Sequence, residues 1–183
     1  MTTLADLGTR IVIVGSTGSG KSTLAGQLAS QLDLPHIELD GLFWGPNWTE
    51  TSPEVFIPKV EAALAGDRWV VDGNYSRVRH IVWPAAETII WLDYSLPIIY
   101  WRLWKRTLRR TLGREQLWEA QNVERFWVQF VTKDSLFLWA LKKHKERRIL
   151  YPQVLGQPEH AHLQVLHFHH PSQTRDWLTH LTS

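Results

Sequence analysis

Arg10-Ile-Val-Ile-Val14 is followed immediately by Gly15-Ser-Thr-Gly-Ser-Gly-Lys-Ser22. The first stretch is a short, continuous apolar run of mostly β-branched residues, which is typical of a strand buried on both faces of a parallel sheet. The second stretch satisfies the pattern GxxxxGK[ST] in full. Residues 21–32 then predict a helix, because Leu24, Leu28 and Leu32 fall on one stripe. A strand, a glycine-rich turn and a helix in this order predict a phosphate-binding loop (P-loop).

Each position of this loop has a physical reason for its residue. Glycines permit backbone conformations in which consecutive N–H groups turn inward around a phosphate, and the helix that begins at Lys21 adds its N-terminal dipole. Lys21 supplies a positive charge for the β- and γ-phosphates, and the Ser22 hydroxyl can bind Mg²⁺. We therefore expect ATP and Mg²⁺ as cofactors. The expected nucleotide-binding residues are Gly15, Ser16, Thr17, Gly18, Ser19, Gly20, Lys21, Ser22 and Thr23.

The composition is that of a globular protein. The chain has 183 residues, of which 44% are hydrophobic and 21% charged, enough for one domain with a core and too few for two ordinary domains. No apolar run approaches the roughly 18 residues that a membrane span needs, and no secretory signal is recognisable at the start. Cysteine is absent, which excludes disulfides and thiolate metal sites. We expect one cytoplasmic domain over residues 1–183.

Strand and helix patterns alternate along the rest of the chain. Further strands are predicted over residues 36–40, 69–72, 88–92 and 163–168, and helices over residues 53–64, 97–112, 115–131, 134–150 and 171–180. This alternation is typical of a parallel α/β sheet with right-handed crossovers. We predict a three-layer P-loop NTPase fold, in which helices flank a five-stranded parallel sheet and a helical lid region covers about residues 110–150.

A second motif is Trp69-Val-Val-Asp-Gly-Asn-Tyr-Ser-Arg77, where an Asp-Gly pair follows a strand, and farther on Trp91-Leu-Asp93 precedes Arg102 and Arg106. With the P-loop near residue 15, these features resemble the nucleoside monophosphate kinase group, and most of all the adenylate-kinase-related family labelled DNA topology modulation protein. The resemblance covers essentially the whole chain. It implies an ATP-dependent phosphotransferase that acts on a small acceptor, with a nucleoside monophosphate as one acceptor class. Asn74-Tyr-Ser-Arg77 replaces the proline-arginine pair of that group, so the acceptor stays open.

Two aspartates follow predicted strands at the edge of the sheet where open α/β folds bind ligands. Asp72 can hold Mg²⁺ together with Ser22, or it forms a turn before Gly73. Asp40 has three interpretations that the sequence leaves open. It can orient an acceptor hydroxyl, as an aspartate does in small-molecule kinases of the P-loop superfamily, act as a second acid in the outer shell of the metal, or only cap a turn.

The acceptor side is expected around the aromatic stretch Phe43-Trp44-Gly-Pro-Asn-Trp48. We expect Asp40, Trp44 and Arg77 to bind the acceptor, with Trp44 stacking on a planar group. The alternative for the tryptophans is packing on the adjacent helix.

The predicted helix over residues 97–112 carries two arcs of side chains at 3.6 residues per turn. The apolar arc consists of Trp101, Trp104, Leu108 and Leu112, and the neighbouring arc of Arg102, Arg106 and Arg109. We expect the apolar arc to pack on the sheet and the arginine arc to border the site. Since lid arginines neutralise the transferred phosphoryl group in the kinases that the chain resembles, Arg106, Arg110 and Arg114 are candidate catalytic residues. A solvated basic face is the alternative.

Positive charge is clustered although the formal net charge is only +2. The two clusters are Arg102, Lys105, Arg106, Arg109, Arg110 and Arg114, and Lys142, Lys143, Lys145, Arg147 and Arg148. Such clusters indicate an anionic partner, either phosphates or nucleic acid. The alternative function is therefore a nucleotide-gated regulatory or DNA-associated P-loop NTPase, against which the small net charge counts.

The nine histidines include His160, His162, His167, His169 and His170 near the C-terminus, with His-x-His spacing at two places. This spacing suits metal ligands, but the lack of cysteine and of a nearby carboxylate pair disfavours a metal site. His169 and His170 follow the last predicted strand, where the resemblance places the adenine edge, so we expect them to line the base.

Overall fold

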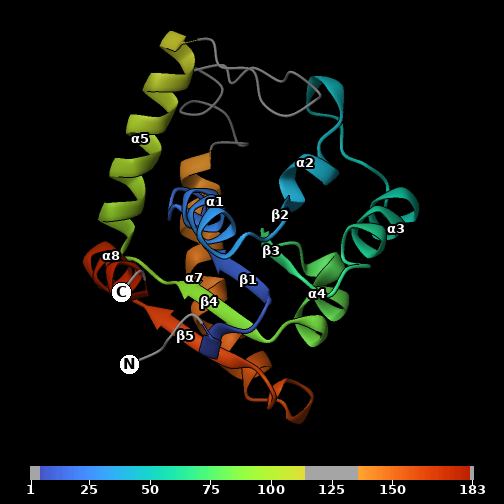
Figure 1. The fold of residues 1–183 in the computed structure, drawn as a ribbon. Coiled ribbons are helices and arrows are strands. Elements are labelled where there is room, and N and C mark those ends of the chain that lie inside the picture. Colours follow the sequence, from blue (N-terminus) through green and yellow to red (C-terminus); the bar gives the residue numbers. More distant parts are fainter. Residues whose placement is uncertain (1–4, 114–135, 182–183) are drawn as a thin grey trace.

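Five parallel strands form one sheet at the centre of the protein (Figure 1). The structure, a computed structural model, describes residues 5–113 and 136–181. The strands are β1 (Arg10–Gly15), β2 (His36–Glu38), β3 (Trp69–Asp72), β4 (Thr88–Leu92) and β5 (Gln164–Phe168). Their order is β2-β3-β1-β4-β5, and neighbours pair in parallel. The predicted five-stranded parallel sheet is confirmed.

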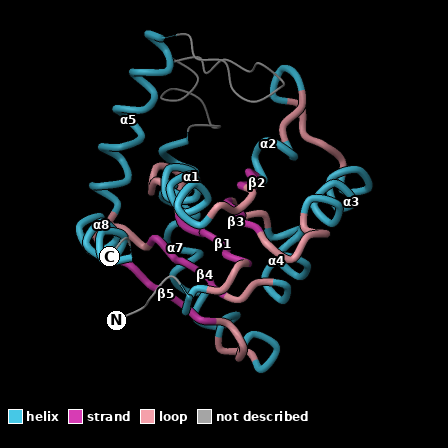
Figure 2. Tube along the Cα trace, in the orientation of Figure 1, coloured by secondary structure: helices cyan, strands magenta, loops and turns pink. Residues whose placement is uncertain are grey.

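Helices surround this sheet (Figure 2). The α-helices are α1 (Lys21–Leu32), α2 (Leu39–Phe43), α3 (Pro53–Ala63), α4 (Arg79–Ala85), α5 (Leu96–Gly113), α7 (Leu136–Leu155) and α8 (Pro171–Leu181). Short 3₁₀ turns are η1 (Ala5–Leu7), η2 (Pro46–Trp48), η3 (Ser76–Val78) and η4 (Pro158–His160). No described helix combines the length and the apolar character that a bilayer span requires.

Side chains of β1 alternate between two apolar layers. Those of Ile11 and Ile13 pack with residues of α1, α5 and α8. Those of Val12 and Val14 pack with residues of α3, α4 and the C-terminal half of α7. Burial on both faces explains why β1 is a continuous apolar run rather than an alternating one. The predicted three-layer arrangement is confirmed.

The second strand and the segment after it differ from the prediction. β2 ends at Glu38 and not at Asp40, because Leu39 and Phe43 are buried as part of the short helix α2. Asp40 therefore lies in the first turn of a helix. The helix α4 was not predicted, since it has only 7 residues and contains Pro84.

The helix expected over residues 134–150 is described as α7 and continues to Leu155, through Pro152. Its buried face extends past Leu150, because the ring of Tyr151 packs at 5.3 Å from the rings of Trp83 and Trp91. The helix expected over residues 115–131 and most of the predicted lid region lie outside the described residues.

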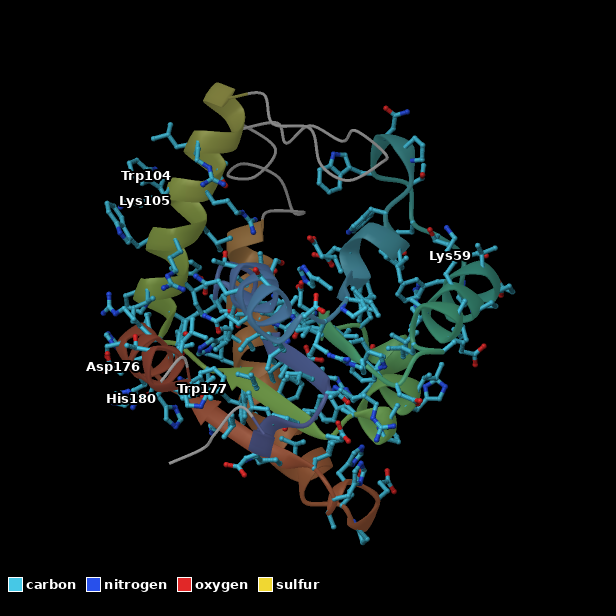
Figure 3. The ribbon with its side chains drawn as sticks, in the orientation of Figure 1. Lys59, Trp104, Lys105, Asp176, Trp177 and His180 are labelled. Atoms are coloured by element: carbon cyan, nitrogen blue, oxygen red, sulfur yellow. The ribbon has the colours of Figure 1, made fainter. Side chains whose placement is uncertain are left out.

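The prediction that the tryptophan arc of α5 packs on the sheet was wrong. Trp101 and Trp104 are 56% and 42% exposed and stack on each other at 5.4 Å, while Leu103 and Thr107 are fully buried. Figure 3 shows Trp104 and Lys105 on the side of α5 that faces away from the rest of the protein. At 100° per residue the tryptophans lie roughly opposite the buried stripe.

Candidate active site

The P-loop connects the end of β1 to the start of α1. Gly15, Gly18 and Gly20 have φ angles of 151°, 84° and 96°, which L side chains rarely adopt. A Cβ on Gly18 would lie 2.7 Å from Cγ of Leu103, so the loop packs directly against α5. Lys21 Nζ donates a hydrogen bond to the Ser16 carbonyl oxygen at 3.4 Å. The sequence therefore builds the turn that its motif predicts.

Replacing Gly18 with alanine is expected to reduce the free energy of unfolding by about 1–3 kcal/mol, because the new Cβ meets Leu103 and φ is positive. Urea denaturation without nucleotide measures this. Gly26→Ala is the matched control, since Gly26 lies inside α1 with nothing within 4 Å of a built Cβ. It should stabilise by about 0.5–1 kcal/mol. Equal effects of the two changes would contradict the packing described here.

Charged side chains from distant parts of the chain converge on Lys21. Burial lowers the pKa of Lys21, the carboxylates of Asp72 and Asp40 raise it, and the guanidinium groups of Arg147 and Arg106 lower it. These groups come from β3, α2, α7 and α5. The structure thus brings Lys21 together with three residues singled out in the sequence, Asp72, Asp40 and Arg106.

Asp72 links the P-loop to β2. The Ser22 hydroxyl donates to Asp72 Oδ1 at 3.0 Å, and His36 Nε2 lies 2.8 Å from Asp72 Oδ2. Asp72 is only 3% exposed, and its hydrogen bond raises the pKa of His36. Sequence reasoning missed His36, because the pairing of β2 with β3 is needed to bring it beside Asp72.

Asn74 holds the start of the P-loop. Its Oδ1 accepts from the Gly15 backbone N–H at 3.0 Å, and its Nδ2 donates to the Gly15 carbonyl oxygen at 2.6 Å. Tyr151 of α7 also donates to Asn74 Oδ1 at 3.3 Å. Gly73 lets the chain turn here, since a Cβ would lie 2.7 Å from that of Leu39. The role of Asn74 was not predicted, although the residue lies in the motif.

Replacing Asn74 with alanine is expected to lower the free energy of unfolding by about 1–3 kcal/mol, because the Gly15 amide and carbonyl lose their partner. Chemical denaturation measures the loss, and titration with ATP measures the weaker binding that a distorted loop should cause. Gln157→Ala removes an exposed amide in the turn after α7 and serves as the control. An Asn74→Ala protein as stable as this control would show that the hydrogen bonds from Asn74 to Gly15 do not stabilise the P-loop.

Asp40 is paired with Tyr75. The Tyr75 hydroxyl donates to Asp40 Oδ1 at 2.7 Å. Burial, followed by the nearby charge of Asp40, raises the pKa of Tyr75, so the phenol stays protonated and orients the carboxylate. Trp44 packs edge-to-face on Phe43 and Trp48 at 5.0 and 5.7 Å. Trp44 thus contacts the last residue of α2 and a residue of η2, and its role in acceptor binding stays a prediction.

A small cavity of about 10 Å³, with room for one water molecule at most, lies beside Asn74 and Tyr75. It is lined by Val12, Val14, Leu39, Gly73, Asn74, Tyr75, Arg79, Val82, Trp83 and Tyr151. The Arg79 guanidinium lies over the rings of Trp83 and Tyr151, 5.0 and 5.5 Å from their centroids. Arg77, the predicted acceptor residue, is instead about half exposed and its NH1 lies 3.8 Å from Glu50 Oε2. Sequence reasoning missed Arg79.

The arginines on α5 take different positions. Arg102 donates to the Ser19 carbonyl oxygen of the P-loop at 2.6 Å and lies over the Tyr94 ring. Arg106 is half-buried and acts on Lys21, whereas Arg109 is exposed. Arg114 and the side chain of Arg110 lie outside what the structure describes.

The basic cluster at residues 142–148 does not form one continuous face. Arg147 is 7% exposed and its charge reaches Lys21. Arg148 donates to Asp93 Oδ1 at 2.7 Å, and Lys143 pairs with Glu146 at 2.7 Å. Arg147 therefore acts inside the protein, whereas Arg148 forms its ion pair from a side chain that is 46% exposed. The sequence indicated Arg147 only as one member of this basic cluster.

Comparisons with solved structures identify the architecture. A shikimate kinase from Bacteroides thetaiotaomicron aligns with a TM-score of 0.54 at 16% identity, over 95% of this chain and 96% of that one. The fold is that of P-loop kinases. A shikimate kinase from Acinetobacter baumannii in complex with shikimate aligns with a TM-score of 0.55 at 15% identity, over 97% of this chain and 92% of that one. A gluconokinase from Sinorhizobium meliloti gives 0.53 at 17% identity, over 96% and 93%. No family model and no curated protein match the sequence.

Proposed function

We propose that this P-loop kinase-like protein transfers the γ-phosphoryl group of ATP to a small-molecule acceptor. The observation that carries the proposal is that the P-loop lysine lies close to two carboxylates, one suited to Mg²⁺ and one suited to an acceptor. Lys21 of a complete P-loop interacts electrostatically with both Asp72 and Asp40, and the Tyr75 hydroxyl holds the Asp40 carboxylate through a hydrogen bond. Donor and acceptor can therefore face each other at the carboxyl edge of one sheet. The likeness to solved P-loop kinases supports this proposal.

Ser22 and Asp72 fit a Mg²⁺ site, because they offer a hydroxyl and a buried carboxylate oxygen 3.0 Å apart, and oxygen ligands are those that Mg²⁺ prefers. When bound, Mg²⁺ neutralises charge on the β- and γ-phosphates. His36 holds the second oxygen of Asp72 and so fixes the plane of the carboxylate.

The chain's own groups divide the work of the transfer. The amides of residues 15–23 and Lys21 bind the phosphates, and Arg102 fixes the loop through Ser19. Arg106 and Arg147 add positive charge where the transferred group becomes more negative. Arg110 and Arg114 stay candidates for the same role from the lid region.

Two acceptor classes have different support. The resemblance to nucleoside monophosphate kinases, and to the family labelled DNA topology modulation protein, favours a nucleoside monophosphate held by Arg77 and Trp44. The Asp40–Tyr75 pair favours an acceptor hydroxyl, whose proton Asp40 would take as phosphoryl transfer proceeds. We propose the hydroxylated acceptor, in a single cytoplasmic kinase domain.

A coupled assay of ADP release tests the function. The protein is given Mg·ATP and a panel of nucleoside monophosphates and of small hydroxylated metabolites. Turnover stimulated by a member of the hydroxylated set supports the proposal, and turnover with nucleoside monophosphates alone would overturn its acceptor class. Absence of any stimulated turnover, together with tight and salt-sensitive DNA binding, would favour a DNA-associated NTPase instead.

A further inference from the structure

Three potential metal ligands meet at the carboxyl ends of β4 and β5, apart from the P-loop. Asp93 directly follows β4, His167 lies in β5, and His169 directly follows β5. His167 Nε2 lies 3.3 Å from Asp93 Oδ2, and His169 Nδ1 lies 3.6 Å from the same oxygen. The ligand atoms of all three residues lie within 4.8 Å of one another. The parallel pairing of β4 with β5 thus supplies the carboxylate that the His-x-His spacing lacked in the sequence.

We propose that Asp93, His167 and His169 bind a transition-metal ion such as Zn²⁺. Two imidazole nitrogens and one carboxylate oxygen are ligands that Zn²⁺ commonly takes. Around a tetrahedral ion with bonds of about 2.0–2.1 Å, ligand atoms stand about 3.4 Å apart. The separations of 3.3 and 3.6 Å from the Asp93 oxygen are close to this spacing, and all three ligand atoms lie within 4.8 Å of one another.

The ligands are held in place by their neighbours. The His167 ring stacks on the Trp91 ring at 3.9 Å with an interplanar angle of 3°. Asp93 is 7% exposed, and its other oxygen, Oδ1, accepts from Arg148 Nε at 2.7 Å. This bond orients the carboxylate and leaves Oδ2 directed at the two histidines, which is the outer-shell support common around metal ligands.

Solvent exposure and nearby charge determine how tightly this site should bind a metal ion and which ion it should prefer. The side chains of His167 and His169 are 33% and 60% exposed, so an ion can enter from solvent and water can fill a fourth position. Arg148 places a positive charge beside the carboxylate, which weakens attraction for a cation. We therefore expect reversible binding. Nitrogen ligands select against Mg²⁺, which separates this site from Ser22 and Asp72.

Such an ion would join the chain after β4 to the end of β5. β5 is the last strand of the sheet order and pairs with β4. A metal link across this pair would stabilise the edge of the sheet. It requires no nucleotide, so its test is independent of the kinase proposal.

Co²⁺ and Zn²⁺ titrations of the full chain without a histidine tag test the site, with excess Mg²⁺ present. Wild-type protein should bind one equivalent of Zn²⁺ by calorimetry and give the visible absorption bands of tetrahedral Co²⁺. His169→Ala should weaken Zn²⁺ binding by roughly 10–100-fold or more and abolish the bands. Since His169 is largely exposed, this change should leave the thermal unfolding of the metal-free protein unchanged.

Two control variants locate the ion. His162→Ala removes another exposed histidine, which lies before β5, and should bind Zn²⁺ like wild type. His36→Gln removes the histidine beside Asp72 and should also keep the bands. The proposal is overturned if wild type gives no Co²⁺ bands, if His169→Ala keeps them, or if His36→Gln alone removes them. In the first case the two histidines only make polar contacts with Asp93.

Discussion

Lys21→Ala is expected to reduce ATP-dependent phosphoryl transfer by on the order of 10³-fold in kcat. Lys21 is the first residue of α1. Its ammonium group interacts electrostatically with four charged side chains, those of Asp72, Asp40, Arg106 and Arg147. Without the ammonium group, the negative charge that develops on the transferred phosphoryl group loses a preorganised hydrogen-bond donor. Removing one such donor typically lowers kcat by about 10²–10³-fold or more. Steady-state kinetics with the acceptor found in the panel measure the effect.

Lys59→Ala is the matched control for this prediction. Lys59 is exposed on α3 and Figure 3 shows it at the outside of the protein. Its removal should change kcat less than twofold, roughly the effect of a surface substitution. Lys21→Ala protein that stays folded and turns over at the rate of the Lys59 variant would disprove the phosphate-binding role of Lys21.

Asp40→Asn is expected to lower kcat by roughly 10²–10⁴-fold with a hydroxylated acceptor, because the amide cannot take the hydroxyl proton. The substitution keeps the size of the side chain and an oxygen to accept from Tyr75. With a nucleoside monophosphate acceptor the loss should be less than tenfold, since a phosphate is already a competent nucleophile. Initial rates with each acceptor class measure the difference.

Two further variants separate chemistry from structure at Asp40. Asp67→Asn alters an exposed aspartate just before β3 and should keep the wild-type rate. Tyr75→Phe removes the donor to Asp40 and should lower kcat by about tenfold or less, because it acts only on the orientation of the carboxylate. If Asp40→Asn leaves the rate with every acceptor unchanged, Asp40 is a helix-turn residue and not a base.

The P-loop and the sheet could be predicted because their causes are local. The alternatives for residues 10–22 are few, since a fully buried strand must be apolar on both faces and a phosphate-binding turn needs glycine at fixed positions. Gly15, Gly18 and Gly20 take positive φ angles in the structure. The conformation of such a segment can be predicted from its own residues, without information from the rest of the chain.

Asn74, His36 and Arg147 could not be assigned from the sequence for the opposite reason. Asn74 contacts Gly15 at a separation of 59 residues, and His36 meets Asp72 only because β2 pairs with β3. Arg147 is placed by α7, which packs on the far side of the sheet from α1 through Tyr151. Each assignment depends on strand order and helix placement, which periodicity along one segment does not contain.

The error on α5 has a similar origin. Ile99, Leu103 and Thr107 define its buried stripe, but Thr107 is polar and the tryptophans are the largest apolar residues on the helix. The prediction placed Trp101 and Trp104 with Leu108 and Leu112 on one apolar arc and assigned that arc to the core. The register of a helix is decided by what fits the adjacent layer, here Gly18 of the P-loop against Leu103.

Helix α5 contacts the P-loop directly, because Gly18 packs against Leu103 and Arg102 donates a hydrogen bond to the Ser19 carbonyl oxygen. Tilting this helix must therefore alter the turn, and a nucleotide that fixes the turn must restrict the tilt. Thermodynamic linkage makes this influence reciprocal. Any ligand that favours one tilt of α5 changes the affinity for ATP by the same factor by which ATP changes the affinity for that ligand.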